Sequence, residues 1–228
     1  MTLTRRELLV GAATGLAAGC DVEDPRGGIL GRVDRWNERV QGTLFAPGRR
    51  ARELPASAIT REEAYPRYHV SPSIPTTPPG WALEVGGMVA RPLRLDLDEL
   101  MRMERAEVRV RHYCVEGWTA VAGWTGVPMS AIAARAGADP RADYVEFRSF
   151  DAGYWSSWDR SSALHPQTIL AYGMNGHPLA PGHGAPLRLY SAVKLGYKMV
   201  KYLTAVRFLP RPSGGYWENR GYEWFAGV

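Results

Sequence analysis

Residues 109–118 read R-V-R-H-Y-C-V-E-G-W, and they predict a strand that leads into a loop with one cysteine. From Glu107 to His112, valines alternate with polar or charged residues, which is the period-two pattern of a strand with one buried face. Cys114 follows at the end of this strand. Arg111, or His112 when protonated, would lower the pKa of the thiol and favour the thiolate, the form that binds metals.

Cys114 by itself fits three kinds of chemistry. It is a candidate thiolate ligand to a soft or high-valent metal, a candidate nucleophile with a histidine base, or a buried structural cysteine. A zinc site is excluded, because the sequence has no C-x-x-C or H-x-x-x-H pair to complete it. No glycine-rich turn of the oxyanion-hole kind follows the cysteine, which argues against the nucleophile.

The rest of the chain predicts short strands, few helices and long loops. Met129–Ala136 is a predicted helix that begins after Pro128. Leu97–Met103 is another, capped by Asp96 or Asp98. Strands are expected at Trp81–Val85, Leu93–Leu95, Tyr144–Phe150, Leu187–Tyr190 and Leu203–Leu209, and a short helix or turn at Pro166–Tyr172. This pattern predicts a single α+β domain with a mixed, mainly β fold rather than a doubly wound parallel sheet.

Composition limits the class of protein. The 228 residues suffice for one medium-sized domain whose buried core needs no disulfides. The two cysteines, Cys20 and Cys114, lie in different sequence contexts, so no disulfide between them is expected. The net charge of +5 comes from scattered arginines, which excludes a nucleic-acid-binding arm. This mild basic balance suits an anionic ligand such as a phosphate, or an ordinary solvated surface.

The N-terminal residues have the layout of an export signal. Arg5-Arg6 precedes an apolar stretch from Leu8 to Ala18, which is too short to span a bilayer comfortably. The arginine pair resembles a twin-arginine signal, a route that exports folded proteins to the cell envelope. Cys20 closes a lipobox-like sequence and is a candidate lipidation site, with a plain cleaved signal as the alternative. Three segments are expected: a signal at residues 1–20, a linker or wrapping segment at 21–58 with a short helix near Val33–Val40, and the domain at 59–228.

R-H-Y-C-V-E-G-W at residues 111–118 resembles the molybdenum-ligand motif of the sulfite-oxidase family of molybdopterin-dependent oxidoreductases. The resemblance implies that Cys114 is the protein's ligand to molybdenum, with the pterin dithiolene and oxo or hydroxo groups as the other ligands. T-A-V-A-G-W-T-G-V-P-M at residues 119–129 is also similar to the family. Trp118 and Trp124 are expected to pack around the loop.

The segment P-G-H-G-A-P-L-R-L at residues 181–189 is similar to the part of this family that grips the pterin phosphate. Gly182 and Gly184 permit close approach of the backbone, and Arg188 offers a bidentate fork for a phosphate. The resemblance extends to the G-Y-W-E-N-R-G-Y at residues 215–222.

Other residues are placed near the cofactor by the same resemblance. Tyr65 stands where the family often has asparagine. Lys198 and Lys201 belong to a K-x-G-x-K-x-x-K segment, with solvated surface lysines as the alternative. The resemblance implies cofactor contacts from Tyr65, Tyr68, His69, Cys114, Ser149, His183, Arg188, Lys198 and Lys201.

The implied function is oxygen-atom transfer at a sulfur-centred substrate, as sulfoxide reduction or as sulfite oxidation, with molybdopterin and molybdenum as cofactors. Arg111 and the lysines would hold an anionic substrate or stabilise charge on the transferred oxygen. The electron partner would be a membrane haem protein or a c-type cytochrome. The rival hypotheses are a non-catalytic envelope lipoprotein or binding module on the same fold, and a hydrolase that uses Cys114 with a histidine. Cys114, His183 and Arg188 together argue against the binding module.

Overall fold

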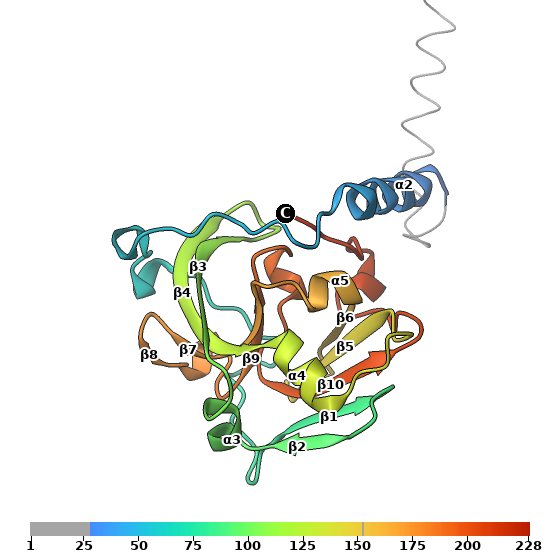
Figure 1. Cartoon of the computed structure of the whole chain (residues 1–228). Helices are drawn as coiled ribbons and strands as arrows, with labels where there is room; N and C mark the ends of the chain where they lie inside the picture. Colours follow the sequence, from blue (N-terminus) through green and yellow to red (C-terminus); the bar gives the residue numbers. More distant parts are fainter. Residues whose placement is uncertain (1–27, 152) are drawn as a thin grey trace, which may run out of the picture.

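The computed structural model describes residues 28–151 and 153–228, and Figure 1 shows two sheets with short helices at their edges. The predicted export signal at residues 1–20 lies outside the described residues. Within the described ranges, no helix is long and apolar enough to cross a membrane.

The first sheet is mixed, with strand order β2–β1–β10–β5–β6. Strands β1 and β10 run parallel, whereas the other neighbours in this sheet are antiparallel. Phe147 on β5 and Phe208 on β10 are fully buried and point into the core. The strands are β1 (Leu83–Gly87), β2 (Leu93–Leu95), β5 (Tyr144–Ser149), β6 (Trp155–Asp159) and β10 (Leu203–Leu209).

The second sheet is antiparallel and carries the hairpin of β3 and β4. Its strand order is β3–β4–β7–β8, and β9 pairs with β7. Cys114 lies at the tip of the hairpin, directly after β3. The strands are β3 (Ala106–Tyr113), β4 (Thr119–Pro128), β7 (Thr168–Met174), β8 (His177–Pro178) and β9 (Arg188–Ser191).

The helices begin and end where the sequence provides caps. Asp96 accepts a hydrogen bond from the Glu99 amide (2.8 Å), and the Glu99 side chain accepts one from the Asp96 amide (2.9 Å), which starts α3 (Leu97–Met101). α4 (Met129–Ala136) ends at Gly137, whose φ of 64° suits glycine. The other α-helices in the described ranges are α2 (Gly28–Leu44) and α5 (Arg160–Ala163).

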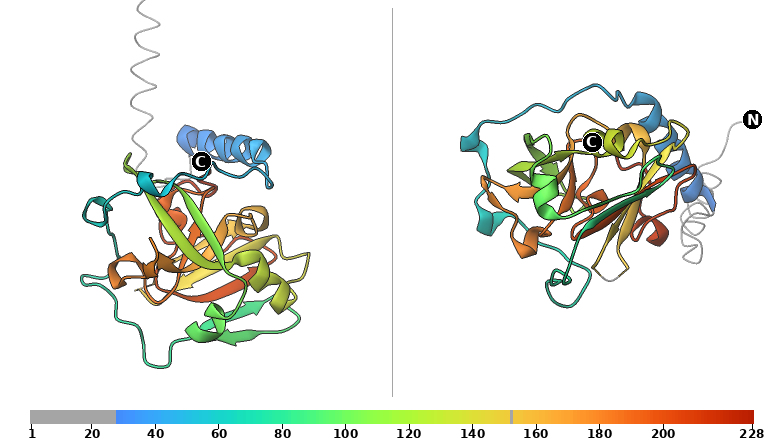
Figure 2. Two further views of the ribbon diagram at one scale, coloured as in Figure 1. Left: turned by 60° about the vertical axis from the view of Figure 1, so that its left-hand side comes forward. Right: turned by 60° about the horizontal axis from the view of Figure 1, so that its bottom comes forward.

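A long segment between α2 and β1 wraps the outside of the second sheet (Figures 1 and 2). The Leu54 amide donates to the Arg109 carbonyl (2.9 Å), and the Thr60 amide donates to the Val121 carbonyl (2.9 Å), so the segment is tied to β3 and β4. Two single-turn 3-10 helices, Ala56–Ala58 and Glu62–Ala64, interrupt it.

The core contains large aromatic side chains as well as aliphatic ones. Trp124 and Tyr190 are fully buried and stack with ring centroids 4.4 Å apart. Phe147 and Trp158 pack edge to face at 5.4 Å. The expectation that Trp124 is a core residue behind the cysteine loop is therefore confirmed.

The structure confirms the predicted mixed, mainly β fold and corrects several elements. Pro166–Tyr172, predicted as a short helix or turn, falls largely within strand β7. The segments 119–128 and 155–159, for which no strand is predicted, form β4 and β6. The helix expected near Val33–Val40 is longer, because α2 runs from Gly28 to Leu44.

Candidate functional site

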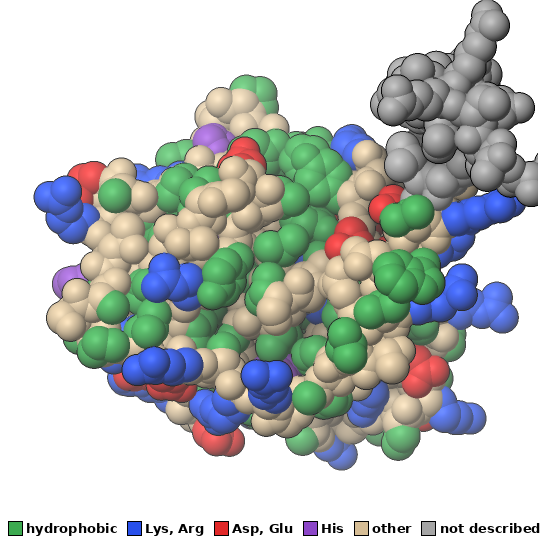
Figure 3. All heavy atoms as spheres, turned by 90° about the horizontal axis from the view of Figure 1, so that it is seen from above, with side chains coloured by type: hydrophobic (Ala, Val, Ile, Leu, Met, Phe, Trp, Pro, Cys, Tyr) green, Lys and Arg blue, Asp and Glu red, His purple; other side chains and the backbone are tan. Residues whose placement is uncertain are grey.

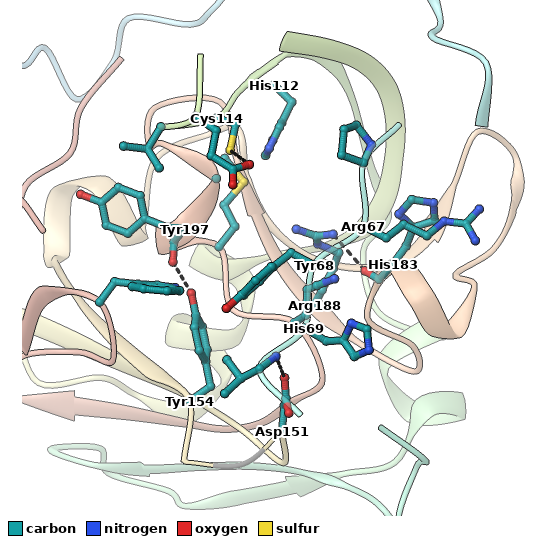
Figure 4. A pocket seen from close by; sticks show the side chains of 18 of the residues that line it. Arg67, Tyr68, His69, His112, Cys114, Asp151, Tyr154, His183, Arg188 and Tyr197 are labelled. Atoms are coloured by element: carbon teal, nitrogen blue, oxygen red, sulfur yellow. Dashed lines mark hydrogen bonds between the residues drawn. The ribbon is translucent and has the colours of Figure 1, made fainter. Parts of the chain in front are cut away.

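A cavity of about 320 Å³ lies beside the tip of the β3–β4 hairpin (Figure 4). Five parts of the chain line it: residues 65–70, the hairpin residues from His112 to Trp118, the end of β5 with residues 151 and 154, residues 183–202, and Trp217 with Tyr222. Segments far apart in the sequence thus form one site.

Cys114 is fixed by the turn that joins β3 to β4. Its amide donates to the Trp118 carbonyl (3.1 Å), and the Gly117 amide donates to the Cys114 carbonyl (3.1 Å). Gly117 has a φ of 88°, a conformation that favours glycine. The Cys114 Sγ is half-buried at the edge of the cavity, 3.6 Å from Glu116 Oε2. The hairpin therefore holds a free thiol at the mouth of the site.

The electrostatics around this thiol differ from the sequence prediction. Burial raises the pKa of the Cys114 thiol, and the nearby Glu116 carboxylate raises it further. Burial lowers the pKa of His112 to about 3, so this imidazole is neutral at pH 7. The prediction that a protonated His112 lowers the pKa of the Cys114 thiol is therefore wrong. A metal ion would have to supply the positive charge that makes the thiolate stable.

The predicted catalytic role of Arg111 is not supported by its position. Val108, Val110 and His112 on β3 are buried, so Arg111 between them points to the opposite, exposed face. Its guanidinium lies 3.4 Å from the Thr119 hydroxyl and does not line the cavity. His112 takes the place in the cavity wall that the sequence prediction gave to Arg111.

A buried cation, Arg188, and a half-buried one, Lys201, line the cavity. Arg188 is 5% exposed; its guanidinium donates to the His183 carbonyl (2.9 Å) and lies 4.7 Å from the centre of a Trp124 ring. Lys201 donates to the Gly182 carbonyl (3.0 Å). Burial and then the Arg188 charge lower the pKa of Lys201 to about 7. Among the described residues neither cation has a carboxylate partner within ion-pair distance.

Four buried polar atoms at this cavity have no hydrogen-bond partner among the described residues. They are the Tyr65 and Tyr202 hydroxyls, His112 Nδ1 and His183 Nε2. Tyr65 packs edge-on against His183, with ring centroids 5.4 Å apart, and also contacts His112 at 5.7 Å. Buried polar atoms are normally hydrogen-bonded. These orphan groups therefore indicate a polar ligand in the cavity.

The segment that carries Tyr68 and His69 is held by Asp151. The Asp151 carboxylate accepts from the amides of Val70 (2.8 Å) and Ser71 (3.0 Å) and from the Ser71 hydroxyl. Tyr68 and His69 both line the cavity, as the resemblance implies. Ser149 lines it too, and its hydroxyl accepts from the Asp151 amide (2.8 Å).

Lys198 does not reach the cavity. Its ammonium is fully buried and donates to Glu218 Oε1 (2.5 Å), the Ser157 carbonyl (3.0 Å) and the Trp224 carbonyl (2.7 Å). All three donors of the ammonium are thus used inside the protein. Lys198 anchors the C-terminal segment. The prediction that Lys198 contacts the cofactor is therefore corrected by the structure.

Several lining residues are missed by the sequence analysis. Arg67 lies between Tyr65 and Tyr68 in the sequence and lines the cavity, and its guanidinium pairs with Glu62 (2.8 Å). Tyr154 and Tyr197 meet through a hydrogen bond from the Tyr154 hydroxyl to the Tyr197 carbonyl. Nothing in the local sequence marks Tyr154, because its place in the site depends on how β5 and β6 pack. The sequence could have indicated Arg67, because it lies between Tyr65 and Tyr68, which are both predicted to contact the cofactor.

The chain is similar to known molybdopterin proteins. It matches the family model of the oxidoreductase molybdopterin binding domain over residues 69–217. It is 37% identical over 226 residues to an Azospira oryzae protein provisionally named as protein-methionine-sulfoxide reductase subunit YedZ1, covering 98% of this chain and 86% of that one. It is 36% identical over 166 residues to the protein-methionine-sulfoxide reductase catalytic subunit MsrP of Xanthomonas campestris, covering 65% of this chain and 52% of that one.

A solved structure shares the fold. The sulfane dehydrogenase SoxCD from Paracoccus pantotrophus matches with a TM-score of 0.56 and 22% identity, over 58% of this chain and 39% of that chain. This likeness concerns the fold alone, and it agrees with the predicted sulfite-oxidase type. The chain therefore belongs to the molybdopterin-binding oxidoreductase family. It is an enzyme whose cofactor is molybdopterin with molybdenum, which confirms the predicted family, enzyme class and cofactor.

The residues of the cavity fit this cofactor. Within residues 28–151 and 153–228, no group of three or more His, Cys, Asp or Glu side chains could hold a metal ion alone. One cysteine thiol with a chelating cofactor matches that donor set. Arg188 and Lys201 offer an anion-binding end, and the orphan atoms of Tyr65, His112 and His183 offer hydrogen bonds. Gly196 leaves room for the His112 imidazole in the wall of the cavity, because a Cβ at residue 196 would lie 2.6 Å from His112 Nε2.

Proposed function

We propose that this enzyme transfers an oxygen atom at a sulfur centre, and that it works as a sulfoxide reductase. Two similar proteins carry names that refer to methionine-sulfoxide reduction, which supports this direction. The MsrP relative is about twice as long as the matched region, so its whole activity is a hypothesis for this chain. Molybdopterin, when bound, supplies the two-electron chemistry in which oxygen moves to or from the substrate.

Cys114 is the residue on which this proposal depends, as the protein's ligand to molybdenum. The observation that carries it is a free thiol held at the edge of a cavity that also contains Arg188 and Lys201, two cations with no carboxylate partner among the described residues. Binding of a metal deprotonates a thiol even when burial raises its pKa. The hairpin turn fixes the position of Sγ through backbone hydrogen bonds, so the ligand is preorganised.

The opposite end of the cofactor would lie at Arg188 and Lys201. A phosphate there would pair with the buried guanidinium and ammonium and would raise the lowered pKa of Lys201. His183, which is neutral because burial lowers its pKa to about 4, would contribute Nε2 as one further polar contact. Tyr65 and His112 would contact the pterin between the phosphate and Cys114.

The mouth of the cavity favours a neutral substrate over an anion. Its exposed residues include Tyr68, Val115 and Tyr222, which are 57%, 46% and 38% exposed. Glu116 also lies at this edge, and Arg111 lies outside it. A sulfite anion would meet a carboxylate there, whereas an alkyl sulfoxide would find apolar contacts. Sulfoxide reduction is therefore preferred, and sulfite oxidation is the second candidate.

The partners and the location belong to the same proposal. A reductase needs an electron donor, and a membrane haem protein or a c-type cytochrome would supply the electrons. The export signal predicted for residues 1–20 supports a place in the cell envelope. The small-molecule partner would be a sulfoxide, such as an oxidised thioether side chain.

Steady-state assays of the purified holoenzyme test the direction of the reaction. With a reduced viologen as donor, we expect turnover of methionine sulfoxide, and with a dye acceptor we expect much slower oxidation of sulfite. A Glu116→Lys variant should gain in kcat/KM for sulfite, because it replaces a repelling charge with an attracting one. Glu116→Gln is its matched control. Faster sulfite oxidation than sulfoxide reduction by the unmodified enzyme would overturn the preference.

A further inference from the structure

Helix α2 attaches to the protein through its polar side chains. Gln41 donates to Glu223 Oε1 (2.6 Å), and its own carbonyl oxygen accepts from the Gly227 amide (3.1 Å). Glu38 accepts from the Trp224 amide (2.9 Å). A surface helix ordinarily buries an apolar stripe against the core. α2 instead uses hydrogen bonds to the C-terminal segment.

Three apolar side chains of α2 are exposed. Val33, Trp36 and Leu44 are 53%, 63% and 77% exposed. At 100° per residue these three positions fall on one side of the helix, and they extend over about 16 Å. Figure 3 looks onto the side of the molecule that carries α2 and the C-terminus, and hydrophobic side chains cover much of it. An exposed apolar ridge of this kind marks a surface that contacts something else.

Basic residues lie next to this ridge. Arg32 and Arg39 are exposed on α2 and lie on its side that neighbours Trp36. α2 also carries two acidic residues: Asp34 is exposed, and Glu38 accepts from the backbone of Trp224. A tryptophan-containing ridge beside arginines is the pattern of a helix that lies in the headgroup region of an anionic bilayer. Tryptophan in particular prefers that region.

We propose that α2 binds an anionic membrane surface, with Val33, Trp36 and Leu44 in the interface. The sequence upstream supports this occupant over a soluble protein. The apolar stretch Leu8–Ala18 and Cys20 precede the helix, and only seven residues lie between Cys20 and Gly28. The eight steps along the chain from Cys20 to Gly28 span at most about 28 Å. Any membrane attachment through residues 8–20 would therefore hold α2 near the bilayer.

This contact would also orient the cavity. Glu223, which Gln41 holds, accepts a hydrogen bond at its carbonyl from the Tyr197 hydroxyl (2.6 Å). Tyr197 and Tyr222 line the cavity that contains Cys114. The membrane-facing helix and the mouth of the site thus share one hydrogen-bonded segment. A donor embedded in the same membrane would meet the site at a defined side.

Vesicle binding by the full chain with Cys20→Ser tests the proposal without a lipid anchor. Vesicles of phosphatidylcholine with phosphatidylglycerol are compared with phosphatidylcholine alone. Arg32→Gln with Arg39→Gln should weaken binding to the anionic vesicles by about fivefold for each arginine. Arg94→Gln with Arg102→Gln, which removes the same charge near β2 and α3 at the far end of Figure 1, should leave binding unchanged.

A depth-dependent readout isolates the helix from residues 1–27, which all variants share. Brominated lipids should quench tryptophan fluorescence of the Cys20→Ser chain, and part of this quenching should disappear in Cys20→Ser with Trp36→Phe. Equal quenching in both proteins would overturn the proposal, as would equal binding by the two arginine pairs. A dimer that Trp36→Ser dissociates would also overturn it, since a second copy would then cover the ridge. Far-UV circular dichroism and cofactor content check that each variant is folded.

Discussion

Arg188 is buried beside Trp124, and among the described residues its guanidinium donates only to the backbone carbonyls of His183 and Leu189. Removing a cation from water without a counter-charge costs several kcal/mol, and a neutral carbonyl offsets only part of this cost. The cost of burying the Arg188 guanidinium must be offset in the cofactor-bound protein. In our account the phosphate of the bound cofactor supplies the missing negative charge.

Replacing Arg188 with methionine should therefore have two opposite effects. The cofactor-free chain should become more stable by about 1–4 kcal/mol, because a buried unpaired charge is removed. The pterin content of the purified enzyme should fall at least tenfold. Urea unfolding and pterin fluorescence after release measure the two effects. Arg111→Met is the control and should change neither, and a pterin content that survives Arg188→Met would refute the phosphate site.

Lys201 predicts a pH dependence of the cofactor-free chain. Its folded pKa of about 7 lies below the unfolded value of about 10.4, so the folded state disfavours the protonated form. The destabilisation is complete below pH 7 and disappears as the pH rises toward 10. Relative to Lys201→Met, the unmodified chain should thus gain on the order of 3 kcal/mol of unfolding free energy between pH 7 and pH 10. Parallel stability curves for the two chains would contradict this assignment.

At this scale the sequence predicted the ligand-like residues better than their neighbours. Cys114, His183 and Arg188 meet at one cavity; Cys114 follows β3 and Arg188 begins β9, two strands that the pattern located, and His183 lies in the turn before β9. Arg111 was assigned inward although Val108 and Val110 already placed His112 on the buried face. The alternation of buried and exposed residues along β3 indicates His112 as the residue that faces the cavity. Arg111 was chosen for its charge alone, and it lies on the exposed face.

β3 and β7 show how burial on one face or on both affects a prediction from the sequence pattern. β3 shows an alternating burial pattern and was predicted within one residue at each end. β7 is buried along almost its whole length, because it lies between β4 and β9, and so it shows no period of two. A continuous apolar run does not distinguish a central strand from a buried helix. The helix or turn predicted at Pro166–Tyr172 was wrong for this reason.

The C-terminal segment is attached to the domain by two buried lysines. Lys198 pairs with Glu218, which also accepts from the Ser156 hydroxyl (2.5 Å). Lys194 pairs with Asp159 (3.1 Å) and donates to the Phe225 carbonyl (2.6 Å). The two lysines of the K-x-G-x-K sequence, Lys194 and Lys198, therefore stabilise the fold by holding the C-terminal segment. Lys201, the third, is the one that reaches the cavity.

Lys198→Met should destabilise the protein by about 3–5 kcal/mol, because it leaves the Glu218 carboxylate buried without this partner. Lys198→Met with Glu218→Leu should recover part of that loss. Urea unfolding measures both, and the cofactor content per folded chain should stay near that of the unmodified enzyme. Normal stability combined with loss of the cofactor would instead support a direct contact between Lys198 and the pterin.

At the scale of the whole molecule, the bound cofactor would contact segments that are far apart in the sequence and would hold them together. The cavity is lined by segments that come from between residues 65 and 222. A ligand that binds the folded state alone stabilises that state by mass action. This dependence on distant segments is also why the sequence could not locate Tyr154 or Tyr197 in the site.

Loss of the cofactor should accordingly loosen two segments more than the rest. Hydrogen exchange should speed up at residues 65–71 and 181–202 in the cofactor-free chain, while the α4 residues, which pack far from the cavity, should keep their protection. Mass spectrometry of deuterated peptides measures both regions in one experiment. Uniform changes across the chain would argue that these segments are not the ones that hold the cofactor.

X-ray absorption at the molybdenum edge tests the bond between Cys114 and the metal most directly. The unmodified enzyme should show one more sulfur neighbour around molybdenum than the pterin dithiolene provides. Cys114→Ser, purified with whatever molybdenum it retains and shown to be folded by circular dichroism, should lack that sulfur. An unchanged sulfur count in the folded variant would mean that Cys114 does not bind the metal, and the account of this site would be wrong.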